Sequence, residues 1–187
     1  MDEAVKSYEK AIAFKPDYIG AHNKLGNIFK ELRQLDEAVK SYEKVIAINP
    51  DYAEAHYNLG NTLRELGQLE TAIKSYEKVI AIKPDYADVH FNLGDTLREL
   101  GQLDEAVKCY EKAISINVDF ADAHNNLGVS LKKLGQLDEA VKCYEKAIFI
   151  EANFANAHNN LGVALQLLGQ LDKAVKCYEK ALAIKPD

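Results

Sequence analysis

The sequence lacks any apolar run approaching the roughly 18 residues that a membrane-spanning helix requires. Its first residues, Met-Asp-Glu-Ala-Val-Lys, lack the basic and then apolar order of a secretory signal. Basic residues are not in excess either, because 23 Lys and Arg stand against 29 Asp and Glu, a net charge of -6. We therefore expect neither a membrane nor a nucleic acid as a partner.

Cysteine is also scarce. The three cysteines, Cys109, Cys143 and Cys177, are separated by intervals of 34 residues. If that interval is one structural repeat, neighbouring copies lie about 8 to 10 Å apart, whereas a disulfide needs Cα atoms within about 7 Å. We expect free thiols, and from them a reducing, cytoplasmic location.

The chain contains a sequence repeat with a period of 34 residues. The segment Ala-His-Tyr-Asn-Leu-Gly at 55–60 returns with small changes at 21–26, 89–94, 123–128 and 157–162. A period of this length indicates a helical solenoid, in which each unit is stable only when stacked on its neighbours. This register predicts one domain over 1–187, with a half repeat at 1–18 followed by full repeats at 19–52, 53–86, 87–120, 121–154 and 155–187.

Each full unit contains two helical patterns. The spacing of Ala55, Leu59, Leu63 and Leu66 predicts a first helix over about 52–66. Asp51, with Glu54 three residues later, predicts a capping box at its start, and Gly67 is the residue that ends it. A second apolar stripe begins after this turn and predicts a second helix that ends near position 83.

The residues Leu59-Gly60, Ala72, Tyr76, Val79 and Pro84 match the signature of the tetratricopeptide repeat (TPR), and the chain resembles that family throughout. The resemblance implies an all-α fold: a right-handed superhelical solenoid of antiparallel helix pairs. It also implies that the first helices line a concave groove for peptides. Departures are Arg33, in place of the glycine that ends the first helix, and Val118 and Ala152, in place of proline.

One asparagine precedes Leu-Gly in four of the repeats, and we call this set the asparagine ladder. An amide can donate to a peptide carbonyl and accept from a peptide N–H, so a ladder could hold an extended backbone. The pattern is similar to the repeat domain of O-linked N-acetylglucosamine transferases, where an equivalent ladder grips peptides. The alternative is that these amides satisfy neighbouring helices. The ladder consists of Asn58, Asn92, Asn126 and Asn160, with Lys24 at the same place in the first repeat.

Further candidates for peptide contact surround the ladder on the same helices. For the aromatic pair Tyr57 and Phe91, the alternative is that they only cover the helix surface. The set is Tyr57, Phe91, Asn125 and Asn159, then Asn27 and Asn61 one turn onward, then Arg64, Arg98 and Lys132. Too few cations accompany the asparagines for the carboxylate clamp of chaperone-binding repeats, which disfavours that class of partner.

All five histidines, His22, His56, His90, His124 and His158, share one repeat position. They are too far apart to share a metal, so we expect packing residues and no metal site or cofactor. No nucleophile, base and orienting acid recur together, so we expect a binding protein and not an enzyme.

The leading hypothesis is a scaffold that binds an extended peptide. One alternative is a substrate-recognition arm of a larger glycosyltransferase-type enzyme. The other is a structural protein that self-assembles through the apolar stripes of its terminal helices, and this would make a homo-oligomer.

Overall fold

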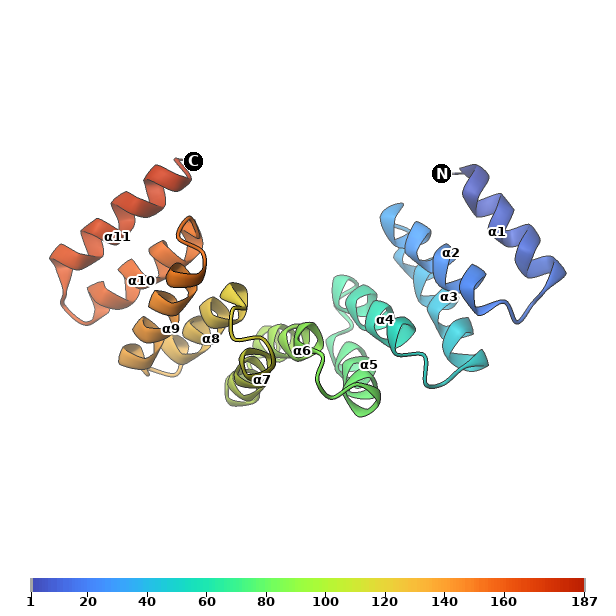
Figure 1. Cartoon of the computed structure of the whole chain (residues 1–187), viewed down its shortest axis with the longest axis horizontal. Helices are drawn as coiled ribbons and strands as arrows, with labels where there is room; N and C mark the ends of the chain where they lie inside the picture. Colours follow the sequence, from blue (N-terminus) through green and yellow to red (C-terminus); the bar gives the residue numbers. More distant parts are fainter. Residues whose placement is uncertain (1, 187) are drawn as a thin grey trace. The chain divides into compact units, whose positions relative to one another are not determined.

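The computed structural model describes residues 2–186, and within them the chain forms eleven α-helices and no strand (Figure 1). The helices group into two compact units, divided between Asp85 and Tyr86. The first unit contains α1 (Asp2–Phe14), α2 (Ile19–Glu31), α3 (Leu35–Ile48), α4 (Ala53–Glu65) and α5 (Leu69–Ile82). The second contains α6 (Ala87–Glu99), α7 (Leu103–Ile116), α8 (Ala121–Lys133), α9 (Leu137–Ile150), α10 (Ala155–Leu167) and α11 (Leu171–Ile184).

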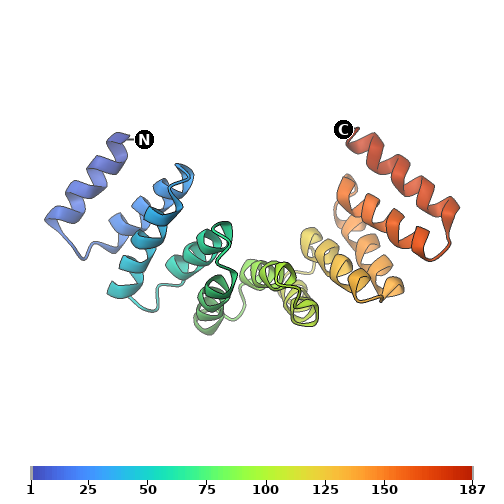
Figure 2. The same ribbon diagram turned by 180° about the vertical axis from the view of Figure 1, so that it is seen from behind.

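The all-helical expectation is confirmed: within each unit, consecutive helices pair as antiparallel hairpins (Figure 2). That a single solenoid spans 1–187 stays a prediction. No helix within residues 2–186 combines the length and the apolar character that crossing a membrane requires.

A glycine and a tyrosine hold each hairpin together. In the second full repeat, a Cβ at Gly60 would lie 2.7 Å from the ring of Tyr76, so only glycine lets the first helix approach the buried phenol. The same contact recurs in the other four full repeats, where the distances would be 2.6 to 2.9 Å. Alanines, leucines and this tyrosine form the core; Tyr42, Tyr76, Tyr110 and Tyr144 are fully buried.

Gly67 ends the first helix as predicted. Its φ of 75° is left-handed, and the N–H groups of Gly67 and Gln68 donate to the carbonyls of Arg64 and Leu63 at 2.9 Å each. These bonds close a Schellman motif. Arg33 takes the same conformation with φ 61°, a region that a side chain disfavours.

The predicted capping box is wrong. Tyr52, not Asp51, is the N-cap of α4, and its side chain caps no backbone N–H. Asp51 lies in the preceding turn, where its N–H donates to Oδ1 of Asn49 at 3.2 Å. The Glu54 carboxylate accepts instead from Nδ2 of Asn23 in the repeat before, at 2.9 Å. Glu54 therefore bonds to the neighbouring repeat and does not take part in a cap at the start of its own helix.

The missing prolines do not lengthen the second helices. α7 and α9 end at Ile116 and Ile150, at the same repeat position as α5, which Pro84 follows. The next residue is extended in each case, with φ of -126° at Asn117 and -129° at Glu151.

We expect Gly128→Ala to lower the free energy of unfolding by about 2 kcal/mol, because the added methyl would lie 2.6 Å from the buried Tyr144 ring. Gly20→Ala is the matched control, since its Cβ would meet only the flexible Tyr18 side chain at 3.3 Å. That change should be neutral or slightly stabilising. Urea unfolding measures both, and equal effects of the two changes would contradict the close-packing argument.

Candidate functional site

The first helices of successive repeats form the inner side of each unit. α2 contacts α4, and α8 contacts both α6 and α10. Within residues 2–186, by contrast, no Cα atoms of α3 and α5, of α7 and α9, or of α9 and α11 lie within 8 Å of each other. Each unit therefore curves toward its first helices, and we call the side that they line the first-helix face.

Buried tyrosine hydroxyls reach this face from the second helices. Tyr42 donates to Oδ1 of Asn27 at 2.7 Å, and Tyr76 donates to Oδ1 of Asn61 at 2.8 Å. Tyr110 donates to Oδ1 of Asp95 at 2.7 Å. Asn27 and Asn61, two of the predicted site residues, thus serve first as acceptors for the core.

The ladder amides are half-buried, and three of them bridge successive repeats. Nδ2 of Asn58 donates to Oδ1 of Asn27 at 3.3 Å, and Nδ2 of Asn126 donates to Oδ1 of Asp95 at 2.8 Å. Asn160 reaches back to Oδ1 of Asn125 at 2.9 Å. One N–H of Asn58, Asn126 and Asn160 therefore satisfies a neighbouring helix.

Asp95 and Arg98 form a charged cluster on the face of the second unit. Nη2 of Arg98 lies 3.4 Å from Oδ1 of Asp95, and its Nε donates to the Tyr110 hydroxyl at 3.2 Å. Burial and the Asp95 charge raise the pKa of Tyr110. The hydroxyl therefore stays protonated and keeps donating to the carboxylate.

The aromatic pair packs against the tyrosines of its own repeats. The ring centroids of Tyr57 and Tyr76 lie 6.4 Å apart, and Phe91 lies 5.9 Å from Tyr110 and 4.8 Å from Phe120. Both side chains are half-buried, so they cover the core while keeping one edge exposed.

The other predicted site residues differ in exposure. Lys24 is exposed, while Arg64 and Lys132 are half-buried. Asn125 is only 7% exposed, and its amide bridges Asn126 and Asn160, so it belongs to the network between repeats and not to the open surface.

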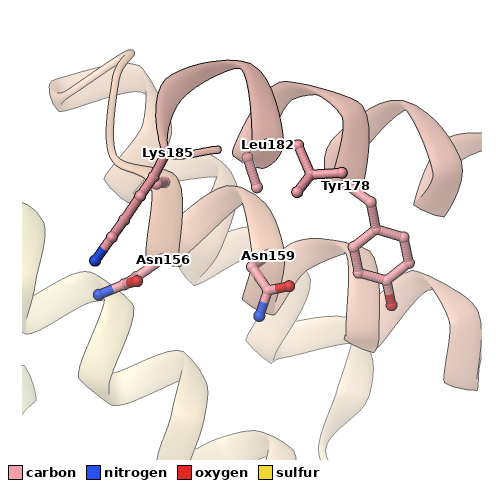
Figure 3. A pocket seen from close by; sticks show the side chains of 7 residues that line it. Asn156, Asn159, Tyr178, Leu182 and Lys185 are labelled. Atoms are coloured by element: carbon pink, nitrogen blue, oxygen red, sulfur yellow. The ribbon is translucent and has the colours of Figure 1, made fainter. Parts of the chain in front are cut away.

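Asn159 lies instead in a cavity of about 410 Å³ between α10 and α11 (Figure 3). Tyr178 and Leu182 also line this cavity. One repeat earlier, the positions of Asn159 and Tyr178 are held by Asn125 and Tyr144, which are 7% and 0% exposed. The cavity therefore corresponds to the space between α8 and α9 that α10 fills one repeat earlier.

The cysteines are poor nucleophiles. Burial, and then nearby glutamates, raise the pKa of Cys109 and Cys143 to about 11, so both thiols are protonated at neutral pH. Three or more metal-ligating side chains gather nowhere in residues 2–186.

Four of the five histidines are buried packing residues, as expected, while His158 is half-buried. His22, His56 and His124 are each less than a tenth exposed. Nε2 of His56 donates to the Pro50 carbonyl at 2.8 Å, and Nε2 of His124 donates to the Val118 carbonyl at 3.1 Å. Burial lowers the pKa of His124 below 6.5, and Lys146 adds to the lowering.

We expect the free energy of unfolding to fall as the pH drops below about 6.5. There the unfolded chain binds a proton at His124 more readily than the folded chain does, so acid favours unfolding. Urea unfolding across this pH range should show that the free energy of unfolding depends less on pH in His124→Gln than in the natural chain. His158→Gln is the control, because it keeps the contribution of His124 and should retain the pH dependence. An unchanged pH dependence in His124→Gln would contradict this assignment.

The sequence reasoning missed the tyrosine hydroxyls as organisers of this face. A signal was present: an amide or acid stands 15 residues before the tyrosine in three repeats, as with Asn27 and Tyr42. It becomes informative once the tyrosine ring is known to be buried, because a buried hydroxyl needs a partner.

Comparison with protein-family models matches the whole chain. The model described as TPR repeat matches residues 1–32, 26–63, 60–97, 94–135 and 130–169. The model described as Tetratricopeptide repeat matches residues 155–187. The comparison with curated proteins gave no match.

Solved structures with this fold include MamA, with 30% identity over 87% of this chain and 95% of that one and a TM-score of 0.83. MamA from Desulfovibrio magneticus RS-1 is 18% identical over 90% and 95% of the two chains, with a TM-score of 0.84. YrrB, described as a TPR protein with an unusual peptide-binding site, is 24% identical over 98% and 94%, with a TM-score of 0.81.

Proposed function

Since the chain belongs to the tetratricopeptide repeat family, we propose that it is a non-enzymatic scaffold that binds an extended peptide on its first-helix face through the asparagine ladder. The observation that carries the proposal is the half-exposed amide repeated on successive first helices.

The bonds between repeats support this role. The bond from Asn126 to Asp95 fixes the plane of the amide, and Asn125 donates to its carbonyl at 3.0 Å. An amide has two N–H donors and two lone pairs, so half of its capacity is left for a ligand. Because the side chain is already ordered, binding costs less conformational entropy.

The spacing also suits a peptide backbone. Adjacent packed helices lie about 8 to 10 Å apart, and an extended chain advances about 3.3 Å per residue. Each ladder amide of a unit would thus meet about every third residue of the peptide, through backbone groups that every sequence shares.

We expect replacement of Asn92, Asn126 and Asn160 by alanine to weaken peptide binding by at least about tenfold, since each lost hydrogen bond contributes about 1 kcal/mol. The probe is a pool of fluorescein-labelled 15-residue peptides of random sequence, followed by fluorescence anisotropy. The matched control replaces the exposed Asn117 and Asn153, and circular dichroism checks the fold of both variants.

Backbone recognition predicts a second result from the same assay. Peptides that are N-methylated at alternate residues should bind more weakly, because they lack the N–H groups that the ladder amides accept from. Equal binding by the ladder variant and the control variant would overturn the proposal.

The same surface would serve the substrate-recognition arm of a glycosyltransferase-type enzyme. The similarity of the Ala-His-Xaa-Asn-Leu pattern to those transferases favours this alternative. A reading frame that continues into a catalytic domain would distinguish the arm from a free scaffold.

Self-association is the second candidate function, and the cavity between α10 and α11 favours it. Leu182, which lines this cavity, is 60% exposed. Leu171 on the same helix is also 60% exposed, and Leu167 at the end of α10 is 61% exposed. Burying apolar area contributes about 25 cal/mol per Å², and soluble oligomers usually close, so a dimer of two copies is the expected form.

We expect the sedimentation coefficient to rise with concentration in the natural chain but not in Leu182→Glu, because a buried charge would oppose contact at the cavity. Val118→Glu is the control, since Val118 is equally exposed but lies in a turn between helices. A natural chain that stays monomeric at every concentration would exclude this candidate.

A further inference from the structure

The junction between α8 and α10 lacks two side-chain acceptors that other junctions possess. Val129 stands at the repeat position of Asp95, which accepts from Tyr110 and Asn126. Leu167 stands at the position of Glu65, which accepts from Lys30 and Arg33 of the repeat before, at 3.0 Å each.

The donors that would face these carboxylates are still present. Tyr144 is 0% exposed, and its hydroxyl has no hydrogen-bond partner among the described residues. Lys132, at the position of Arg98, forms no ion pair within residues 2–186. Lys133 stands where the three preceding repeats carry Glu31, Glu65 and Glu99, and since Glu65 reaches back to the repeat before, Lys133 belongs to the junction of α8 with α6.

Neighbouring side chains respond to the change. Nδ2 of Asn160 cannot donate to Val129, as Asn126 does to Asp95, and it turns to Oδ1 of Asn125. In the last repeat Val163 also lacks an acceptor, yet Tyr178 donates to Oε1 of Gln166 at 2.8 Å. Lys132 occupies the place of Gln166 and cannot accept a hydrogen bond.

We propose that Lys132 and the Tyr144 hydroxyl, between the apolar side chains of Val129 and Leu167, form a subsite for a carboxylate of the bound peptide. The ligand carboxylate accepts from Tyr144 as Asp95 does from Tyr110, and pairs with Lys132 as Glu65 does with Lys30. Its source is an acidic side chain flanked by apolar residues or a C-terminal carboxylate.

Burial strengthens the subsite. Lys132 has no ion-pair partner among residues 2–186, and burial, followed by Lys133, lowers its pKa. A carboxylate relieves this cost, and an ion pair that is half removed from water is stronger than an exposed one. Lys132 stands where Arg98 covers the Tyr110 hydroxyl, so movement of its stem toward a bound anion uncovers the Tyr144 hydroxyl as a further donor.

This inference deepens the proposed function and rests on it for the peptide, but the subsite can be tested without one. The probe is glutarate, titrated into the ¹⁵N-labelled full chain, with uncharged glutaramide as the matched ligand. We expect saturable shifts of the amide signals of 129–133 and Tyr144 with glutarate alone, and a rise in the pKa of Lys132 measured at its ¹³Cε.

Variants define the site. Lys132→Met should weaken glutarate binding by about fivefold to tenfold, whereas Lys142→Met on the second helix should not. Val129→Asp and Leu167→Glu each restore an internal carboxylate, so each should remove glutarate binding without lowering the unfolding temperature. If one of them fails to fold, the other still gives the result.

Three outcomes would overturn the subsite: no saturable shift in the natural chain, equal glutarate binding in Val129→Asp and Leu167→Glu, or equal losses in Lys132→Met and Lys142→Met. The last would show that any lysine contributes only general charge attraction.

Three peptides identify the source of the carboxylate. Acetyl-Ser-Leu-Glu-Leu-Ser-amide carries it on a side chain, and acetyl-Ser-Leu-Gln-Leu-Ser with a free C-terminus carries it at the end. The amidated Gln peptide carries neither and should bind about fivefold to tenfold more weakly than the better of the other two.

The two proposals fail separately. Equal affinities for all three peptides would overturn the subsite and leave the ladder standing. Glutarate binding together with a ladder variant that binds peptides normally would overturn the ladder and leave the subsite standing.

Discussion

The structure depends on a phenol ring that must be buried while its hydroxyl must not be left unpaired. The contact of Gly60 with Tyr76, repeated in each hairpin, seals the ring between two helices. A hydroxyl removed from water without a partner costs about 1 to 3 kcal/mol. The hydroxyl reaches the first-helix face, where the first helix supplies an acceptor to Tyr42, Tyr76, Tyr110 and Tyr178.

That acceptor also joins neighbouring repeats. Oδ1 of Asn27 receives both the Tyr42 hydroxyl and the amide of Asn58. Asp95 does the same for Tyr110 and Asn126. One oxygen therefore links the core of a hairpin to the next first helix. The ladder amides are held in place by the same bonds that stabilise the stack, so a role in packing and a role in binding are compatible.

The periodicity of the sequence predicted the hairpins, and Gly67 ends its helix as the pattern indicates. The cap at Asp51 was wrong because Glu54 finds Asn23, a partner 31 residues away that no local pattern reveals. Asn125 likewise occupies a position where Tyr57 and Phe91 are half-exposed, yet it is buried. Periodicity assigns a residue to a face, whereas the partners of a polar side chain depend on distances between stacked repeats.

Because the glycine and tyrosine fix each hairpin, the first-helix face can change its chemistry without changing the fold. The last two full repeats show how much one position decides. Both have valine where the tyrosine hydroxyl needs an acceptor, and Gln166 supplies one in the last repeat. A glutamine at position 132 could accept a hydrogen bond from Tyr144 in the same way, but Lys132 cannot accept one, and the Tyr144 hydroxyl has no partner among the described residues. Local conflicts of this kind concentrate at functional sites. The lysine is costly to the isolated chain, and the cost disappears when an anion binds.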